Sequence, residues 1–118
     1  MSGTLAYLQP DEEAAVSEYL TRLIDRLNGR LVGMHLFGSK ARGDFMPDSD
    51  LDLLIILKND DWKTKDTVRF IAADVSLEYD VLINTHILSQ ARWEKMARQQ
   101  ATLWQEVRRD GVPLMSDQ

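Results

Sequence analysis

The feature that most constrains the fold is the segment of residues 50–57, with the sequence DLDLLIIL. Its first half alternates acid and leucine, which is the two-residue period of a β-strand, and its second half is apolar throughout. A strand that is apolar on both faces is typical of a central strand buried within a domain. The segment therefore predicts a central strand that carries Asp50 and Asp52 on one of its faces.

Hydrophobic periodicity in the rest of the chain predicts an α/β domain. Helices are expected at residues 10–27, 61–76 and within 89–110, and further strands at residues 31–37 and 79–85. Ser89 is expected to cap a helix, and Gly111 to end the last one. The chain has 118 residues without a repeat or a linker, so we expect residues 1–118 to form one domain.

Composition excludes several classes of protein. The net charge of -5 argues against bulk nucleic-acid binding, which needs a basic surface, although a metal ion can supply the charge for one bound nucleotide. The absence of cysteine excludes disulfides and thiolate zinc sites. The start of the chain has no secretory signal, and the apolar stretch at residues 53–57 is far too short to cross a bilayer. A cytoplasmic protein without membrane contact is therefore expected.

A glycine–serine corner follows the strand expected at residues 31–37. Gly38 and Ser39 precede a short helix start, where backbone N–H groups are unpaired and a glycine lets the backbone approach a phosphate closely. Ser39 adds a hydroxyl donor, and Lys40 and Arg42 add positive charge nearby. The corner is thus a candidate triphosphate site, although a glycine–serine pair alone is more often an ordinary turn.

Two carboxylates on one strand face are a candidate metal site. Asp50 and Asp52 repel each other when close together, and a cation between them relieves that repulsion. Ligand sets made only of oxygen favour magnesium or manganese. A solvated strand end is the alternative for an isolated pair of this kind, but only ten residues separate Ser39 from Asp50. A return of the chain over that distance predicts that triphosphate and metal share one site.

The glycine–serine pair, ten residues and Asp-X-Asp together resemble the signature of the DNA polymerase beta-like nucleotidyltransferase superfamily. The strings GSKARG at residues 38–43 and SDLDL at 49–53 are similar to its minimal bacterial and archaeal members, the MNT proteins. Those are commonly antitoxins paired with HEPN ribonuclease toxins. The resemblance is strong over residues 36–57 and weaker up to Asn84. It implies a polymerase beta-like fold, with a small mixed sheet and helices packed mainly on one face.

The resemblance also implies roles for individual residues. The glycine–serine corner would hold the triphosphate, and Asp50 and Asp52 would bind divalent metal ions. The family has a third carboxylate on a later strand, as base or as metal ligand. Asp80 is the best match, with Glu78 as the alternative on the same face of the strand expected at residues 79–85. If neither reaches the metals, the chain would bind nucleotide without turning it over.

Other polar side chains can be interpreted either as part of the site or as structural residues. Arg42 would contact a phosphate or pair with Asp44, Asp48 or another acid. Lys40 would lie near the phosphates or be solvated. His86 is expected in a loop after the third strand.

Three functions follow from the resemblance. The first is transfer of a nucleotidyl group from ATP, or another nucleoside triphosphate, to a protein partner such as a HEPN toxin. The second is a non-catalytic antitoxin in which the nucleotide site is vestigial or regulatory. The third, transfer to a small molecule of the aminoglycoside type, ranks lower because the chain has no room for a substrate domain. A homo- or hetero-oligomer would be compatible with each.

Overall fold

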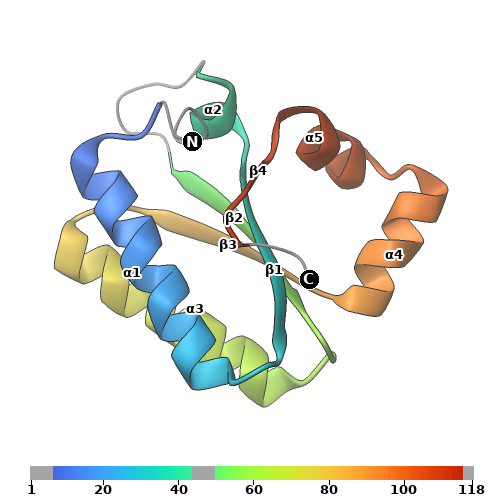
Figure 1. Cartoon of the computed structure of the whole chain (residues 1–118), viewed down its shortest axis with the longest axis horizontal. Coiled ribbons are helices and arrows are strands. Elements are labelled where there is room, and N and C mark those ends of the chain that lie inside the picture. Colours follow the sequence, from blue (N-terminus) through green and yellow to red (C-terminus); the bar gives the residue numbers. More distant parts are fainter. Residues whose placement is uncertain (1–6, 44–49, 116–118) are drawn as a thin grey trace.

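The computed structural model describes residues 7–43 and 50–115, which form a mixed four-stranded sheet with helices on both faces (Figure 1). The strand order is β3-β2-β1-β4. The strands are β1 (Leu31–Phe37), β2 (Leu51–Leu57), β3 (Ile83–Ser89) and β4 (Val112–Pro113). β1 runs antiparallel to both β2 and β4, whereas β2 and β3 are parallel. The predicted central strand is therefore confirmed as β2, which has a strand on either side.

Five helices connect or flank these strands. They are α1 (Pro10–Leu27), α2 (Ser39–Arg42), α3 (Trp62–Tyr79), α4 (Gln90–Gln99) and α5 (Thr102–Asp110). α3 is the crossover that parallel strands require, because it leads from the end of β2 back to the start of β3. The predictions for α1 and β1 are confirmed at both ends. The predicted cap is confirmed too, since Ser89 Oγ accepts a hydrogen bond from the backbone N–H of Arg92.

The two faces of the sheet are covered differently. α1 and α3 lie side by side against one face, where Tyr19, Leu23, Leu53, Ile55 and other apolar side chains form the larger core cluster (Figure 1). α4 and α5 lie against the other face, over a smaller cluster of Phe37, Leu54, Ile56 and Val107. Because side chains alternate along β2, its odd-numbered residues face the first cluster and its even-numbered residues the second. Asp52 therefore projects from the face that α4 and α5 cover in part.

The strand predicted at residues 79–85 is wrong in its position. α3 continues to Tyr79, and Asp80 is its left-handed C-cap, with φ of 56° and its N–H bonded to the carbonyl of Ser76. The reason lies in the spacing of apolar residues, because Tyr79 follows Val75 by four positions and packs against the same core. A tyrosine suits a strand equally well, so local pattern could not decide between the two. β3 begins only at Ile83.

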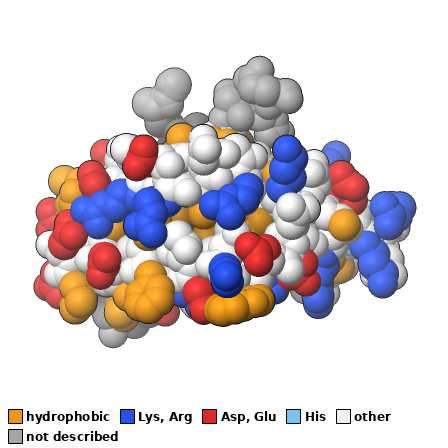
Figure 2. All heavy atoms as spheres, turned by 90° about the horizontal axis from the view of Figure 1, so that it is seen from below, with side chains coloured by type: hydrophobic (Ala, Val, Ile, Leu, Met, Phe, Trp, Pro, Cys, Tyr) orange, Lys and Arg blue, Asp and Glu red, His pale blue; other side chains and the backbone are white. Residues whose placement is uncertain are grey.

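The face of the molecule that is seen from below the view of Figure 1 is mixed in charge (Figure 2). Viewed from that side, basic and acidic side chains are interspersed, with separate hydrophobic patches near one edge (Figure 2). Within residues 7–43 and 50–115, no helix has the length and apolar character that crossing a membrane would need.

Candidate active site at the start of β2

The corner after β1 lies directly against the second aspartate. Gly38 is buried and has φ of 79° and ψ of -158°, a conformation that glycine adopts far more readily than other residues. A β-carbon at this position would collide with Oδ2 of Asp52 and would lie 3.2 Å from its Cγ. A side chain here would thus occupy the space beside the carboxylate. The absence of one leaves the Gly38 backbone and the Asp52 carboxylate in close approach.

Strand register explains why these two segments meet. β1 and β2 are antiparallel, and Phe37 is the partner of Asp52 across the ladder. The end of β1 is therefore next to the start of β2, and the intervening residues only have to return the chain. Residues 44–49 of that return lie outside the described residues, and with them Asp44 and Asp48. The predicted juxtaposition of the glycine corner with the aspartate strand is confirmed for Gly38 and Asp52.

Two polar side chains from β3 complete the surroundings of Asp52. Parallel pairing places Asn84 beside Asp52, and Asn84 Nδ2 donates a hydrogen bond of 3.0 Å to Asp52 Oδ1. His86 follows two residues later on the same face, with Nε2 3.5 Å from that oxygen. The imidazole also stands edge-on to the ring of Phe37, with centroids 4.9 Å apart. Asp52 is consequently oriented by two neighbours on β3.

Asn84 and His86 are residues that sequence reasoning did not assign to the site. His86 was expected in a loop, because the third strand was placed four residues too early. The spacing of Asn84 and His86, two residues apart, could have indicated that both lie on one strand face. It points to the site only once Asp52 is known to be paired with Asn84. That pairing is a property of the sheet and not of the local sequence.

The donor set at the start of β2 suits one hard cation. Asp50 is exposed immediately before the strand, one strand period from Asp52, whose side chain is 24% exposed. Two carboxylates and an amide side chain are ligands that magnesium accepts. In the described part of the chain, no group of three or more His, Cys, Asp or Glu residues is arranged to hold a metal. A cation at Asp50 and Asp52 would therefore draw its remaining ligands from other groups, such as the Asn84 amide, the nucleotide or water.

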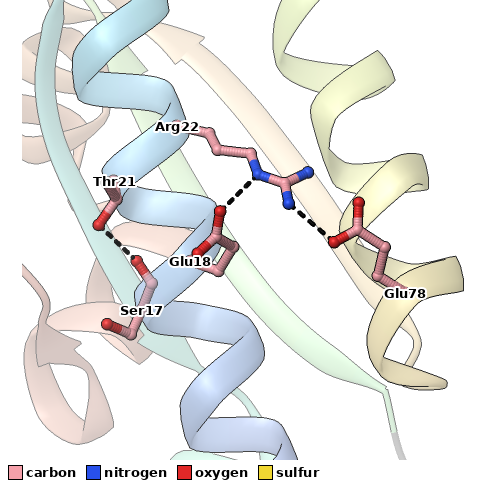
Figure 3. Close-up of polar contacts among 5 residues, drawn as sticks. All are labelled: Ser17, Glu18, Thr21, Arg22 and Glu78. Carbon is pink, nitrogen blue, oxygen red and sulfur yellow. Dashed lines mark hydrogen bonds and ion pairs between the residues drawn. The ribbon is translucent and has the colours of Figure 1, made fainter.

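Neither predicted third carboxylate lies on β3. Asp80 is exposed at the C-cap of α3, three residues before the strand begins. Glu78 lies on α3, where its Oε1 accepts a hydrogen bond of 2.8 Å from Nη2 of Arg22 (Figure 3). Arg22 also bonds to Glu18, so it joins α1 to α3, and its hydrogen bond holds the pKa of Glu78 below the usual range. The strand position predicted for both acids is wrong, and Asn84 takes the place next to Asp52.

Lys40, which was predicted to lie near the phosphates or in solvent, is buried and contacts another side chain. Its side chain is 1% exposed, and its Nζ lies 2.7 Å from Oε2 of Glu12, near the start of α1. The carboxylate of Glu12 accepts in addition the backbone N–H of Gln9, in a capping box. A buried ion pair of this kind depends on both partners, because either charge alone would be left without compensation. Lys40 therefore joins α2 to α1.

Arg42 pairs with an acid, which was one of its two predicted readings. Its Nη1 lies 3.4 Å from Oε2 of Glu106 on α5, and both side chains remain about one-third exposed, at 33% and 31%. Glu106, which belongs to a helix distant in sequence, is thus one acid that Arg42 contacts. Ser39, the first residue of α2, is partly exposed next to Gly38 and keeps its hydroxyl as a candidate phosphate donor.

Known proteins resemble this chain in sequence and in fold. The family model of the nucleotidyltransferase domain matches residues 16–102. A relative from Methanocaldococcus jannaschii, named "Putative protein adenylyltransferase MJ0604", is 35% identical over 85 residues, which are 72% of this chain and 81% of the relative. A second protein of that organism, named as the same kind of enzyme, is 39% identical over 70 residues, which are 58% of this chain and 71% of the relative.

Solved structures support the fold. A chain of the toxin-antitoxin complex MntA-HpeT superimposes with a TM-score of 0.53 at 17% identity, covering 86% of this chain and 73% of that one. A toxin-antitoxin structure with AMP-PNP gives the same TM-score of 0.53 at 19% identity, with coverage of 86% and 73%. These likenesses confirm the expected polymerase beta-like fold with a mixed sheet, and the match over most of the sequence confirms the expected superfamily. The helices do not pack mainly on one face as expected, because α4 and α5 cover part of the second face. The chain belongs to the nucleotidyltransferase domain family.

Proposed function

We propose that this nucleotidyltransferase moves an adenylyl group from ATP to a hydroxyl of a partner protein, with magnesium bound at Asp50 and Asp52. The observation that carries the proposal is the close approach of the Gly38 backbone to the Asp52 carboxylate. A phosphate-binding corner and a cation site are then adjacent, which is what a metal-bound triphosphate requires. ATP is favoured because the relatives are named adenylyltransferases and a structural neighbour was solved with AMP-PNP.

Each residue of the site has a defined task in this reaction. The Gly38 backbone leaves room for the triphosphate, and the Ser39 hydroxyl donates to a phosphate oxygen. Asn84 holds Asp52 in place through its amide. His86, a base within the site, accepts the proton of the attacking hydroxyl. Magnesium, when bound, offsets the negative charge of the triphosphate and of the departing pyrophosphate.

The bond changes are those of an in-line displacement. The acceptor oxygen forms a bond to the α-phosphorus, and the bond from that phosphorus to the bridging oxygen of the β-phosphate breaks. Pyrophosphate carries away the electron pair of the broken bond. Positioning and charge stabilisation supply most of the rate, so an ordered Asp52 matters more than any covalent role for the protein.

A toxin is the proposed acceptor. Two structural neighbours with TM-scores of 0.53 are chains of toxin-antitoxin structures, and the sequence motifs resemble those of antitoxins paired with HEPN toxins. The described site is also accessible, because Asn84 is exposed and Asp52 and His86 are partly exposed. A second polypeptide is well suited to bring its hydroxyl to this open end of the sheet.

The test uses ATP labelled in the α-phosphate, magnesium and the product of the neighbouring gene. We expect label on that product with the wild type and none with the double variant Asp50→Ala, Asp52→Ala. Both side chains are at least partly exposed, so the variant should keep its fold, as a circular dichroism melt would verify. Transfer by the double variant at the wild-type rate would refute the site. Absence of label on the partner with the wild type would refute the acceptor.

A second function, neutralisation by binding alone, is favoured by the amide at Asn84. An amide beside Asp52 brings no negative charge, so the site holds a metal less tightly than one with a carboxylate there. We expect Asn84→Asp to bind manganese at least several-fold more tightly than the wild type, measured by calorimetry without nucleotide. Thr85→Asp, on the opposite face of β3, is the matched control. If toxin neutralisation survives the loss of Asp50 and Asp52, binding alone is sufficient.

A further inference from the structure

The outer face of α3 exposes large hydrophobic side chains. Trp62, Phe70 and Leu77 are 66%, 72% and 83% exposed. Exposed hydrophobic residues are common singly, but three of this size on one helix are a feature of interaction surfaces. None belongs to the core that α3 shares with α1 and the sheet, which uses Val68, Val75 and their neighbours. The three exposed side chains therefore do not help to pack the core of the domain.

The three side chains form one stripe. Each residue turns a helix by about 100°, so Phe70 and Leu77 lie within about 20° of each other, and Trp62 within about 80° of both. The three side chains thus share one broad side of α3, and at 1.5 Å per residue the stripe is about 22 Å long. Between its members lie Asp66 and Ala73, which with Arg69 and Phe70 line an open hollow of about 330 Å³. The small Ala73 next to Phe70 provides a recess beside a projecting ring.

Charge along α3 is divided between its two ends. Lys63 lies near the N-terminus on one flank of the stripe, and Asp74 and Glu78 lie towards the C-terminus on that same flank. The first turn has no acidic residue and the last turn no basic one, so the charges oppose the dipole of their own helix. A second helix running in the opposite direction would match both the charges and the dipole.

We propose that α3 is a self-association surface, on which a second copy of this chain docks its own α3 in antiparallel orientation. A two-fold axis near Phe70 sets the two Phe70 rings together and places Lys63 of each copy opposite Asp74 of the other, while Glu78 stays paired with Arg22 of its own copy. Antiparallel helices pair like flanks, so both sets of opposite charges form at once. Arg69 is already paired with Asp66 in its own copy, at 3.1 Å, which reduces repulsion between the copies.

The dimer leaves the candidate active site accessible. α3 packs against the face of the sheet opposite to Asp52, Asn84 and His86. Self-association through α3 therefore does not depend on nucleotide, metal or toxin. Self-association can therefore be measured independently of the proposed transfer reaction, and either proposal can fail without the other.

Single cysteines provide the direct test, because the chain has none of its own. Phe70→Cys lies next to the proposed axis and should give a disulfide-linked dimer as the main product of mild oxidation. Ile24→Cys, at a residue of α1 that is 50% exposed, is the matched control and should form no disulfide cross-link between copies. Equal cross-linking of the two variants, or none of either, would overturn the proposal.

Charge reversal tests the antiparallel orientation. Lys63→Glu and Asp74→Lys should each raise the dissociation constant of the dimer at least about fivefold in sedimentation equilibrium, and their combination should restore most of the affinity. Phe70→Lys should raise it at least about tenfold, while Ile24→Lys should leave it unchanged. A wild-type chain that remains monomeric at millimolar concentration contradicts the dimer. The dimer is also contradicted if Phe70→Lys binds the toxin more weakly but self-associates as the wild type does.

Discussion

The two faces of β2 show how one strand divides stability from chemistry. Leu51, Leu53, Ile55 and Leu57 point to the α1–α3 layer and are all essentially inaccessible to solvent. The opposite face begins with the partly exposed Asp52 and becomes apolar only further along the strand. One face is thus closed over its full length, whereas the other is closed only at the end that α4 and α5 reach. The comparison shows that polar residues can occupy the start of the second face because burial of the first face stabilises the sheet along the whole strand.

The most damaging change should be a truncation on the closed face. Leu53 is 0% exposed, and Leu53→Ala removes buried methyl groups and leaves a cavity, which costs about 3 kcal/mol of unfolding free energy. Asp52→Asn on the open face should cost less than about 1 kcal/mol, because the carboxamide keeps the shape of the side chain. Urea denaturation of both variants measures the difference. Comparable losses for the two would contradict the division between the faces.

A smaller effect is expected at the glycine corner. Gly38→Ala places a methyl group against the Asp52 carboxylate and strains a positive φ, which should cost about 2 kcal/mol and abolish nucleotide binding. Gly29→Ala is the matched control, because Gly29 also has a positive φ of 94° but nothing within 4 Å of the added carbon. It should cost about 1 kcal/mol and leave binding intact. Equal effects at Gly29 and Gly38 would show that the contact with Asp52 is unimportant.

The smallest effect should come from the ion pairs on the outside of the closed face. The hydrogen bond from Arg22 lowers the pKa of Glu78 in the folded protein, so the ionised carboxylate stabilises the fold above the usual glutamate range of about 4. This contribution is lost as pH falls through the lowered pKa. Glu78→Gln should therefore melt slightly below the wild type at pH 7 and together with it near pH 2. Glu94→Gln, on the exposed surface of α4, is the control.

Much of the candidate site followed from local pattern. The strand containing Asp52 and the corner at Gly38 were predicted from alternation, from glycine and from a spacing of ten residues, and β1 ends where that corner begins. The partner of Asp52 was not predictable in this way. Asn84 became its neighbour only because β3 starts at Ile83 and pairs in parallel with β2. A shift in the start of that strand exchanges every neighbour across the ladder.

The roles of the two cations after the corner were likewise decided by packing. Lys40 and Arg42 stand beside Ser39 in sequence, which made both candidates for phosphate contacts. In the fold, α2 lies between α1 and α5, so the two side chains reach Glu12 and Glu106. Neither acid lies within 25 residues along the chain from the cation that it meets, and no local rule connects such pairs.

By itself, the sequence determined which segments are helices and strands over most of the chain and where the glycine corner stands, because periodicity and glycine act over a few residues. Only the tertiary structure decided that α3 takes up Tyr79, that Asn84 lies beside Asp52, and that Lys40 is buried against α1. Those outcomes depend on side chains from distant segments competing for the same core and the same hydrogen bonds. Such competition is settled by the packing of the whole domain.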